Sequence, residues 1–443
     1  MRRAGSWLAA AAAAGAVLGA GAGCGKKKRQ TRSGDAAPVE LVSVAALADG
    51  GVGKPGEAEE HEPNDGADVA TPLSPGTAAR GRIEPDLDVD YYRIDVAQAG
   101  ALAVQLAAVP GVDLTLDLED TSGTPLARSD RGAAGVSEGV PNLGVTPGRY
   151  TAIVRKKAPP AKKQVRPKKG APPPPEPPPG SAPLYQITAQ VAPVARTAER
   201  EPDDDRGTSN DLIIGETVTG YVGWTGDADV WKLSVEALTD KNLLDVELAP
   251  VEGVVLAVEI ADGIGQPILT RRGPRGAGLV IRGLAPIVSQ GASPYHYVTV
   301  RADRPNPEAS YQLKVGAPPR GTDPELEPND SPDKPMAIPS ERTVIGDARW
   351  TPGDVDCYAI PPDPDARTLI VNLDTPTEAD LRLELLVNGK SVETADQKGK
   401  GTPEKISGPV PANGHAVLCV RGSEASQEGK YSFGFQNGPA KGP

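Results

Sequence analysis

The feature that most constrains this chain is an acidic pattern that occurs three times. Each copy opens with Glu-x-Glu-Pro-(Asn/Asp)-Asp and later has an Asp-x-Asp-x-aromatic segment. The glutamate before proline and the second aspartate of the later pair are 28 residues apart in two copies and 29 in the third. Chance rarely gives so constant a spacing. The chain is therefore a tandem array, and its function has to be inferred from the repeated unit.

The length and charge of the chain agree with this view. A chain of 443 residues suggests about three domains. Its 51 glycines, 47 prolines and few aromatic residues suit short strands joined by turns. The net charge of −12 argues against nucleic acid as the main partner, because phosphate binding needs a dense basic surface. An acidic surface with regularly placed carboxylates fits divalent cations better.

Short alternating segments predict an all-β fold. After the Asp-x-Asp pair of the first copy, Tyr92, Ile94 and Val96 alternate with more polar residues, which is typical of a strand with one buried face. No ten-residue stretch shows a helical stripe. The pattern favours one antiparallel β-sandwich per repeat. The three expected domains are residues 59–193, 198–317 and 324–437.

A Lys/Pro-rich segment, residues 156–183, interrupts the first repeat only. Its composition predicts an exposed polyproline-like loop. It could be a basic arm that reaches an anionic envelope polymer, or a spacer without a partner, since such inserts are tolerated at loop tips.

The N-terminus has the pattern of an export signal. A basic start, a short Ala/Gly/Leu-rich run and small residues before Cys24 predict a secretory signal peptide over residues 1–23. The ending resembles a bacterial lipobox, although Gly21 stands where leucine is preferred. The resemblance implies that Cys24 carries the lipid anchor, that residues 24–58 form a tether, and that the protein lies at the bacterial outer membrane. Ordinary signal cleavage, with Cys24 an incidental thiol, is the alternative.

The repeated motifs together resemble the bacterial pre-peptidase C-terminal (PPC) domain family, which includes collagen-binding domains of clostridial collagenases. The first repeat has Glu-Pro-Asn-Asp from Glu62, a glycine at Gly81, Asp-x-Asp-Tyr-Tyr, a Pro-Gly-x-Tyr strand and a closing Tyr strand from Tyr185. The second has Asp203 for the asparagine and Trp231 for the tyrosine. The third lacks the late tyrosine. The resemblance implies jelly-roll-like β-sandwiches without a peptidase domain.

The resemblance also implies a calcium site in each repeat. Ca²⁺ takes six to eight oxygen ligands, mostly from carboxylates, amides and the backbone. The alternative is that the motifs are only a turn and a solvated strand entry. Carried over by position, the candidate ligands are Glu60, Glu62, Asn64, Asp65, Asp88 and Asp90; Glu199, Glu201, Asp203, Asp204, Asp227 and Asp229; and Glu325, Glu327, Asn329, Asp330, Asp354 and Asp356.

No motif favours an enzyme. Residues 135–139 match the Gly-x-Ser-x-Gly nucleophile pattern around Ser137, but they lack a strand-turn-helix context and a histidine in a suggestive pattern. Trp224 and Trp350 precede their Asp-x-Asp pairs and could stack against a sugar. We expect them instead to cover the end of a core.

Cys357 and Cys419 both lie in the third repeat. They could form a disulfide, provided that their strands are neighbours.

The sequence thus predicts a non-enzymatic, lipid-anchored envelope protein. Its modules would bind a protein or polysaccharide partner and would be stabilised by calcium. The alternative is an accessory or targeting subunit of a secreted peptidase or export system.

Overall fold

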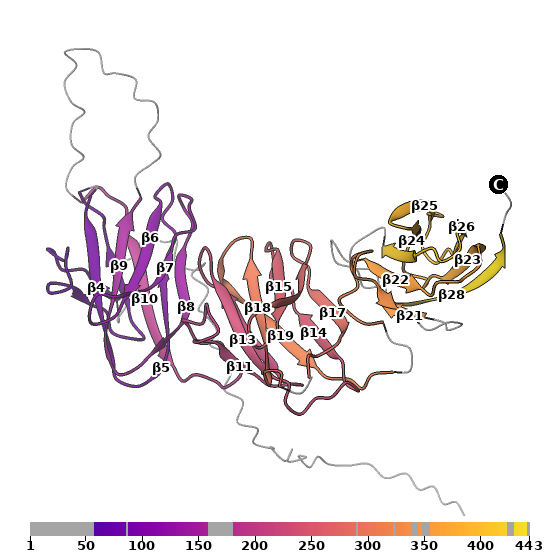
Figure 1. The fold of residues 1–443 in the computed structure, drawn as a ribbon. Coiled ribbons are helices and arrows are strands. Elements are labelled where there is room, and N and C mark those ends of the chain that lie inside the picture. The colour runs from indigo at the N-terminus through magenta and orange to yellow at the C-terminus, as the bar shows by residue number, and fades with distance from the viewer. Residues whose placement is uncertain are drawn as a thin grey trace, which may run out of the picture. The chain divides into compact units, whose positions relative to one another are not determined.

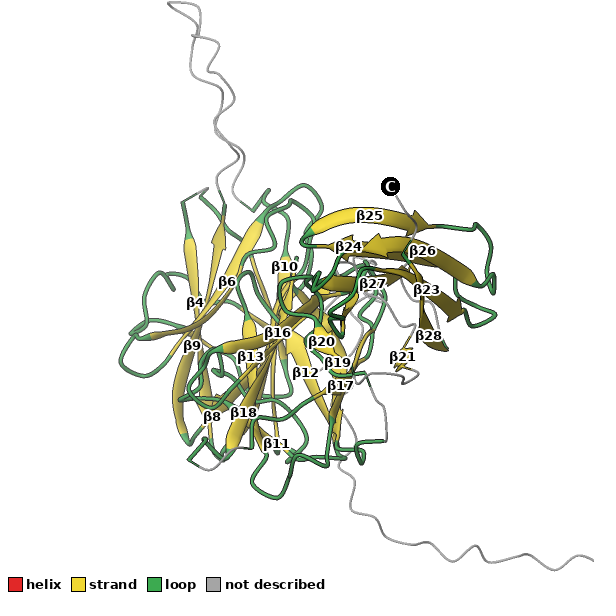
Figure 2. Ribbon diagram, turned by 45° about the vertical axis from the view of Figure 1, so that its right-hand side comes forward, coloured by secondary structure: helices red, strands yellow, loops and turns green. Residues whose placement is uncertain are grey.

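The computed structural model describes residues 57–85, 87–157, 180–288, 291–321, 325–338, 344–347, 355–422 and 429–440. All regular secondary structure in these residues is β, as Figures 1 and 2 show. This confirms the predicted fold class. No helix in this part of the chain is long and apolar enough to cross a membrane. The predicted signal peptide, Cys24, nearly all of the tether, most of the Lys/Pro-rich loop, Trp350 and Asp354 lie outside the described residues.

The first repeat consists of two five-stranded sheets, ordered β1-β3-β10-β5-β8 and β2-β4-β9-β6-β7. Residues of both sheets, such as Val104 and Tyr92, share one buried hydrophobic cluster, so the core lies between the sheets. The strands are β1 Glu57–Glu59, β2 Thr71–Pro72, β3 Ala78–Gly81, β4 Val89–Val96, β5 Gly100–Leu106, β6 Leu114–Glu119, β7 Pro125–Ser129, β8 Glu138–Val145, β9 Gly148–Lys156 and β10 Tyr185–Ala192.

The second repeat has a five-stranded sheet, β11-β13-β18-β15-β16, and a four-stranded sheet, β12-β19-β14-β17. These sheets also share one core, to which Trp231 and Tyr311 contribute. The strands are β11 Asn210–Leu212, β12 Thr217–Val222, β13 Ala228–Ser234, β14 Leu244–Leu248, β15 Leu256–Ala261, β16 Pro267–Arg272, β17 Leu279–Leu284, β18 Tyr295–Ala302 and β19 Asn306–Gly316.

The third repeat follows the same plan, with sheets β20-β22-β27-β24-β25 and β21-β28-β23-β26 around a third cluster. The strands are β20 Met336–Ala337, β21 Val344–Asp347, β22 Asp356–Ile360, β23 Arg367–Asp374, β24 Leu381–Val387, β25 Lys390–Ala395, β26 Glu404–Val410, β27 Ala416–Gly422 and β28 Lys430–Pro439.

The alternation of apolar and polar residues predicted some strands of the structure but not others. In β4, Tyr92, Ile94 and Val96 are buried while Asp95 is exposed, as the period-2 pattern predicts. Strand β8 was not predicted. Its first six residues are all buried, so it has no exposed face to produce an alternating pattern.

The third repeat contains the disulfide that the sequence left open. Strands β22 and β27 are antiparallel neighbours, and Cys357 lies directly opposite Cys419 in their register. Their Cα atoms are 4.1 Å apart and the two sulfur atoms are bonded. Both cysteines are fully buried in a small cluster with Val355, separate from the main core of the repeat.

Trp224 is partly buried and packs against the core of the first repeat, although it belongs to the second. The prediction that it covers a core is therefore right, but the core is that of the preceding repeat.

Candidate cation sites

The opening segment of each repeat is fastened beside the strand that begins at the Asp-x-Asp pair. The backbone N–H that follows the second aspartate donates to the carbonyl of the residue after proline in all three copies. These bonds run from Tyr91 to Asn64, from Val230 to Asp203 and from Cys357 to Asn329, at 3.0, 3.2 and 3.0 Å. Carboxylates almost thirty residues apart in sequence are thereby brought together.

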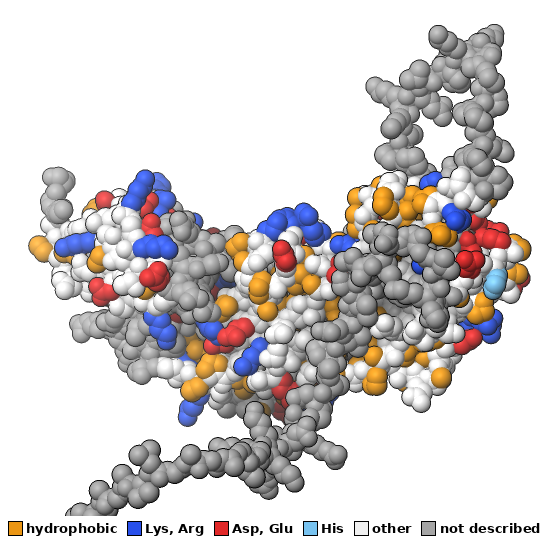
Figure 3. All heavy atoms as spheres, turned by 180° about the vertical axis from the view of Figure 1, so that it is seen from behind, with side chains coloured by type: hydrophobic (Ala, Val, Ile, Leu, Met, Phe, Trp, Pro, Cys, Tyr) orange, Lys and Arg blue, Asp and Glu red, His pale blue; other side chains and the backbone are white. Residues whose placement is uncertain are grey.

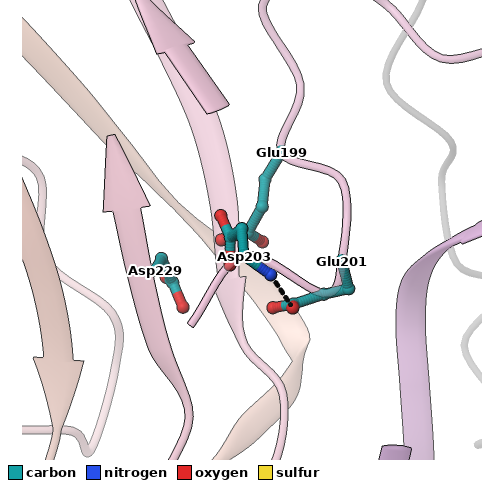
Figure 4. A group of neighbouring side chains, drawn as sticks. All are labelled: Glu199, Glu201, Asp203 and Asp229. Carbon is teal, nitrogen blue, oxygen red and sulfur yellow. Dashed lines mark hydrogen bonds between the residues drawn. The ribbon is translucent and has the colours of Figure 1, made fainter. Parts of the chain in front are cut away.

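The second repeat holds the most compact group. Glu199, Glu201, Asp203 and Asp229 each offer a carboxylate oxygen within 4.8 Å of the others. Figure 4 shows these four side chains lying close together. All four residues are at most 2 % exposed. Both oxygens of Asp229, and one oxygen each of Glu201 and Asp203, are buried without a hydrogen-bond donor. A buried carboxylate oxygen without a donor is costly unless a cation or a proton compensates it.

Burial sets the protonation of this group. Burial, together with the charges of neighbouring carboxylates, raises the pKa of Glu201 to about 12 and the pKa of Asp203 to about 7. Burial also holds the pKa values of Glu199 and Asp229 well above their ordinary range. Without a cation, the group therefore retains protons at neutral pH. A divalent cation would allow its members to ionise, since opposite charge favours the charged form.

The first repeat has two overlapping groups that share one residue. Glu60, Glu62 and Asp90 form one, and Glu62, Asp65 and Asp88 form the other. Asp90 is fully buried, and burial together with the charge of Glu60 raises its pKa to about 8. Glu62 is exposed, so this site is more open than that of the second repeat.

One position has the same property in all three repeats. The residue after proline is fully buried, and one of its side-chain oxygens has no hydrogen-bond donor. These oxygens are the Oδ1 atoms of Asn64, Asp203 and Asn329. An unpartnered amide or carboxylate oxygen beside acidic groups is a fitting ligand for Ca²⁺.

Several predicted ligands have other partners. Asp204 and Asp227 accept hydrogen bonds from the backbone N–H groups of Ala228 and Gly223. They do not belong to the compact group of the second repeat.

In the part of the third repeat that the structure describes, no three carboxylates come as close together as in the other repeats. Glu325 accepts a 3.3 Å hydrogen bond from Asn329, and Asp356 accepts one from Tyr431. Glu327 and Asp330 contact Arg271 of the second repeat at 2.7 and 2.8 Å.

A tyrosine on the closing strand lies beside the acidic residues of each repeat, a role that was not predicted from the sequence. The Tyr185 hydroxyl donates to Asp90, and the Tyr431 hydroxyl donates to Asp356 at 2.6 Å. In the second repeat, the Tyr311 hydroxyl accepts from the indole of Trp231 at 2.9 Å. It also lies 3.3 Å from a Glu199 oxygen. The sequence signal for this role is that a tyrosine recurs in the closing strand of every repeat, as Tyr185, Tyr311 and Tyr431.

A glycine that recurs in the three repeats leaves room for this tyrosine. A Cβ atom on the glycine would lie 2.3 Å or less from an atom of the tyrosine ring or hydroxyl, closer than real Cβ contacts. The pairs are Gly81 with Tyr185, Gly220 with Tyr311 and Gly346 with Tyr431. Close approach of a side chain to the backbone thus explains the glycine.

The opening segments also contact the preceding repeat. The Glu201 N–H donates to the Asn142 carbonyl at 3.1 Å, and the Gly144 N–H donates to the Glu201 carbonyl at 2.7 Å. Glu327 makes the corresponding bond to the Gly283 carbonyl at 3.0 Å. Each of these glutamates therefore joins an edge strand of the repeat before it, β8 or β17.

The Gly-x-Ser-x-Gly match lacks catalytic geometry. The Ser137 hydroxyl donates to Glu308 at 2.8 Å. His296 is buried and bonded to backbone groups, while His61 and His415 are exposed. No hydrogen bond joins Ser137 to a histidine within the described ranges.

Figure 3 shows one face of the molecule, on which acidic, basic and apolar side chains are interspersed. Among the described residues on that face, basic side chains form no single continuous patch.

The comparisons with known proteins give a fold-level likeness only. No protein-family model matches the sequence, and no curated protein matches it. One similar solved structure is the pre-peptidase C-terminal domain of collagenase from Bacillus anthracis. It is 16 % identical, with 29 % of this chain and 99 % of that chain covered and a TM-score of 0.20.

Another similar structure is the CBM22-1–CBM22-2 tandem domain of Xyn10C from Paenibacillus barcinonensis. The identity is 9 %, the coverage is 47 % of this chain and 83 % of that chain, and the TM-score is 0.16. Membership of the PPC family stays a prediction.

Proposed function

We propose that this chain is a non-enzymatic envelope protein whose three β-sandwich modules bind a protein or polysaccharide partner, and that calcium stabilises the first two modules at their opening segments. One observation carries the cation part of the proposal. In the second repeat, four buried carboxylates converge and leave buried oxygens without hydrogen-bond donors. Oxygen ligands of this kind suit Ca²⁺.

The same residues argue for a structural role of the cation. Glu201 accepts from the Asp203 N–H of its own turn, whereas Glu199 accepts from the Tyr221 N–H on strand β12 and lies beside the buried Tyr311 hydroxyl. The cluster therefore links the opening segment to the core. A cation there would bind only the folded module and would raise its stability by about 2.7 kcal/mol at a concentration one hundred times its Kd.

A calcium titration tests this proposal. The full chain is first treated with a chelator, and its melting temperature is then measured as CaCl₂ is added. We expect an upward shift for the wild type and a smaller shift for Asp229→Asn. Glu236→Gln is the matched control, because Glu236 is exposed in the same repeat. Absence of any shift in the wild type, or equal shifts in both variants, would contradict calcium binding.

The envelope location depends on Cys24, which lies outside the described residues. We propose that Cys24 is lipidated and anchors the modules at the outer membrane. Intact mass spectrometry of the mature N-terminus tests this. A mass that includes acyl chains on Cys24 is expected, and an unmodified N-terminus downstream of Cys24 would refute it.

The partner is sought by pull-down from envelope fractions, with and without chelator. We expect a protein or polysaccharide whose capture falls when the chelator is present. If the captured partner is a peptidase or an export component, the chain is instead an accessory subunit of that system.

A further inference from the structure

The side chain of Arg271 crosses from the second repeat to the opening segment of the third. Its Nη2 atom lies 2.7 Å from Glu327 and 2.8 Å from Asp330, and its Nη1 atom donates to the other Asp330 oxygen at 2.9 Å. The side chains of Arg271 and Glu327 are 5 % and 7 % exposed. The pair of Arg271 with Glu327 is therefore buried, while the Asp330 side chain is 26 % exposed. The planar guanidinium suits such a multidentate contact with two carboxylates.

Arg271 stands at a position that has no basic residue in the other repeats. In each repeat, a row of paired residues runs across one sheet from the second aspartate of the Asp-x-Asp pair to the edge strand. The rows are Asp90, Val154, Leu116 and Ser129; Asp229, Val300, Val258 and Arg271; and Asp356, Val420, Leu383 and Ala395.

Among the described residues, no arginine or lysine forms an ion pair with the acidic cluster at the junction between the first and second repeats. The side chain of Ser129 donates to Glu138 of its own repeat. The cluster of the second repeat is instead approached by Asn142, a neutral amide that donates to Glu199. An ion pair does join these repeats, between Arg131 and Glu308, but it is partly exposed, with side chains 20 % and 45 % accessible. Exposed pairs contribute little.

We propose that Arg271 is the built-in counter-cation of the third repeat's opening segment, so that the junction between the second and third repeats holds without a metal ion. The guanidinium meets the two carboxylates from the outside of the third repeat, where a divalent cation would otherwise balance them. Because removal of one partner leaves a buried charge uncompensated, loss of Arg271 opens this junction.

The test measures the distance between two spin labels across the junction in the full chain. The labels are attached to cysteines introduced at Ile264, which is 70 % exposed, and at the exposed Lys398. In chelator, the wild type should give one narrow distance distribution. The Arg271→Gln variant should give a broad distance distribution instead. Arg272→Gln is the matched control, because this neighbouring arginine is exposed and carries the same charge.

A second variant separates loss of the contact from misfolding of the second repeat. Asp330→Asn removes a partner from the other side of the junction, and it should also broaden the distribution. The inference is overturned if the wild type is already broad in chelator, or if Arg271→Gln stays as narrow as Arg272→Gln. The calcium titration of Asp229→Asn reports on the proposed cation binding separately, so the two ideas can fail independently.

Discussion

Replacing Asp203 with asparagine should stabilise the cation-free protein at high pH. The substitution fits sterically, because asparagine occupies the same position in the first and third repeats, as Asn64 and Asn329. It removes one charge from a group of four buried carboxylates. An asparagine there can also donate to Glu199, as Asn329 donates to Glu325 in the third repeat.

The magnitude follows from the pKa of Asp203, which burial raises from 3.8 to about 7. One pKa unit corresponds to about 1.4 kcal/mol, so ionising Asp203 in the folded, cation-free protein costs up to about 4 kcal/mol. A raised carboxyl pKa means that the folded state binds the proton more tightly than the unfolded state. The cost is therefore absent below pH 3.8, grows as the pH rises, and is complete above pH 7.

Urea unfolding in chelator, followed by tryptophan emission, measures this effect because Trp231 is buried in the core of the second repeat. At pH 8 we expect Asp203→Asn to raise the free energy of unfolding by up to about 4 kcal/mol, and at pH 4 to leave it nearly unchanged. In saturating calcium the gain should shrink, since the variant has lost a charged ligand. A destabilised variant at pH 8, or the same gain at both pH values, would refute the reasoning.

Three further predictions concern other parts of the repeats. Gly220→Ala should lower the free energy of unfolding by at least about 1–3 kcal/mol in urea titrations, because its Cβ would lie 2.3 Å from the Tyr311 hydroxyl. Replacing both Cys357 and Cys419 with alanine removes a crosslink between residues 62 positions apart. The free energy of unfolding should fall by about 2–5 kcal/mol. Calorimetry measures this, and an unchanged unfolding transition of the third repeat would contradict the prediction. Burial raises the pKa of Asp90 from 3.8 to about 8, so the cation-free melting temperature should fall as the pH rises through this window. Asp90→Asn should flatten that dependence.

The sequence predicts those features of the structure that produce a periodic pattern of apolar and polar residues. The buried faces of β4 and β5 were predictable, because one face of each strand packs on the core and the other is less buried. Strand β8 was not, because most of it is buried on both faces. The pairing of Cys357 with Cys419 needed the register of two strands 62 residues apart, and no local pattern encodes that register.

The candidate site shows the same division. The constant spacing of the motifs indicated that the opening segment and the Asp-x-Asp pair meet, and the structure brings most of their carboxylates together in the first two repeats. The spacing carried no information about Arg271, which belongs to another repeat and lies on an edge strand. Contacts between repeats are set by surfaces that a motif within one repeat does not describe.

In the first two repeats, the two aspartates of the Asp-x-Asp pair have different tasks, and this decides how the site is interpreted. The first closes the turn that precedes the strand: Asp88 accepts from the Glu84 N–H at 2.9 Å, and Asp227 accepts from the Gly223 N–H. The second is fully buried beside the closing tyrosine, as Asp90 is beside Tyr185.

A catalytic carboxylate pair would need both members to face a common substrate. Here one member is bonded to the backbone and the other to the core, in a cluster that also ties down the opening segment. The arrangement therefore acts as a fastening between distant parts of one module. We propose that its need for a counter-charge makes the cluster responsive to cations in the first two repeats. In the third repeat, an arginine of the neighbouring repeat contacts Glu327 and Asp330 instead.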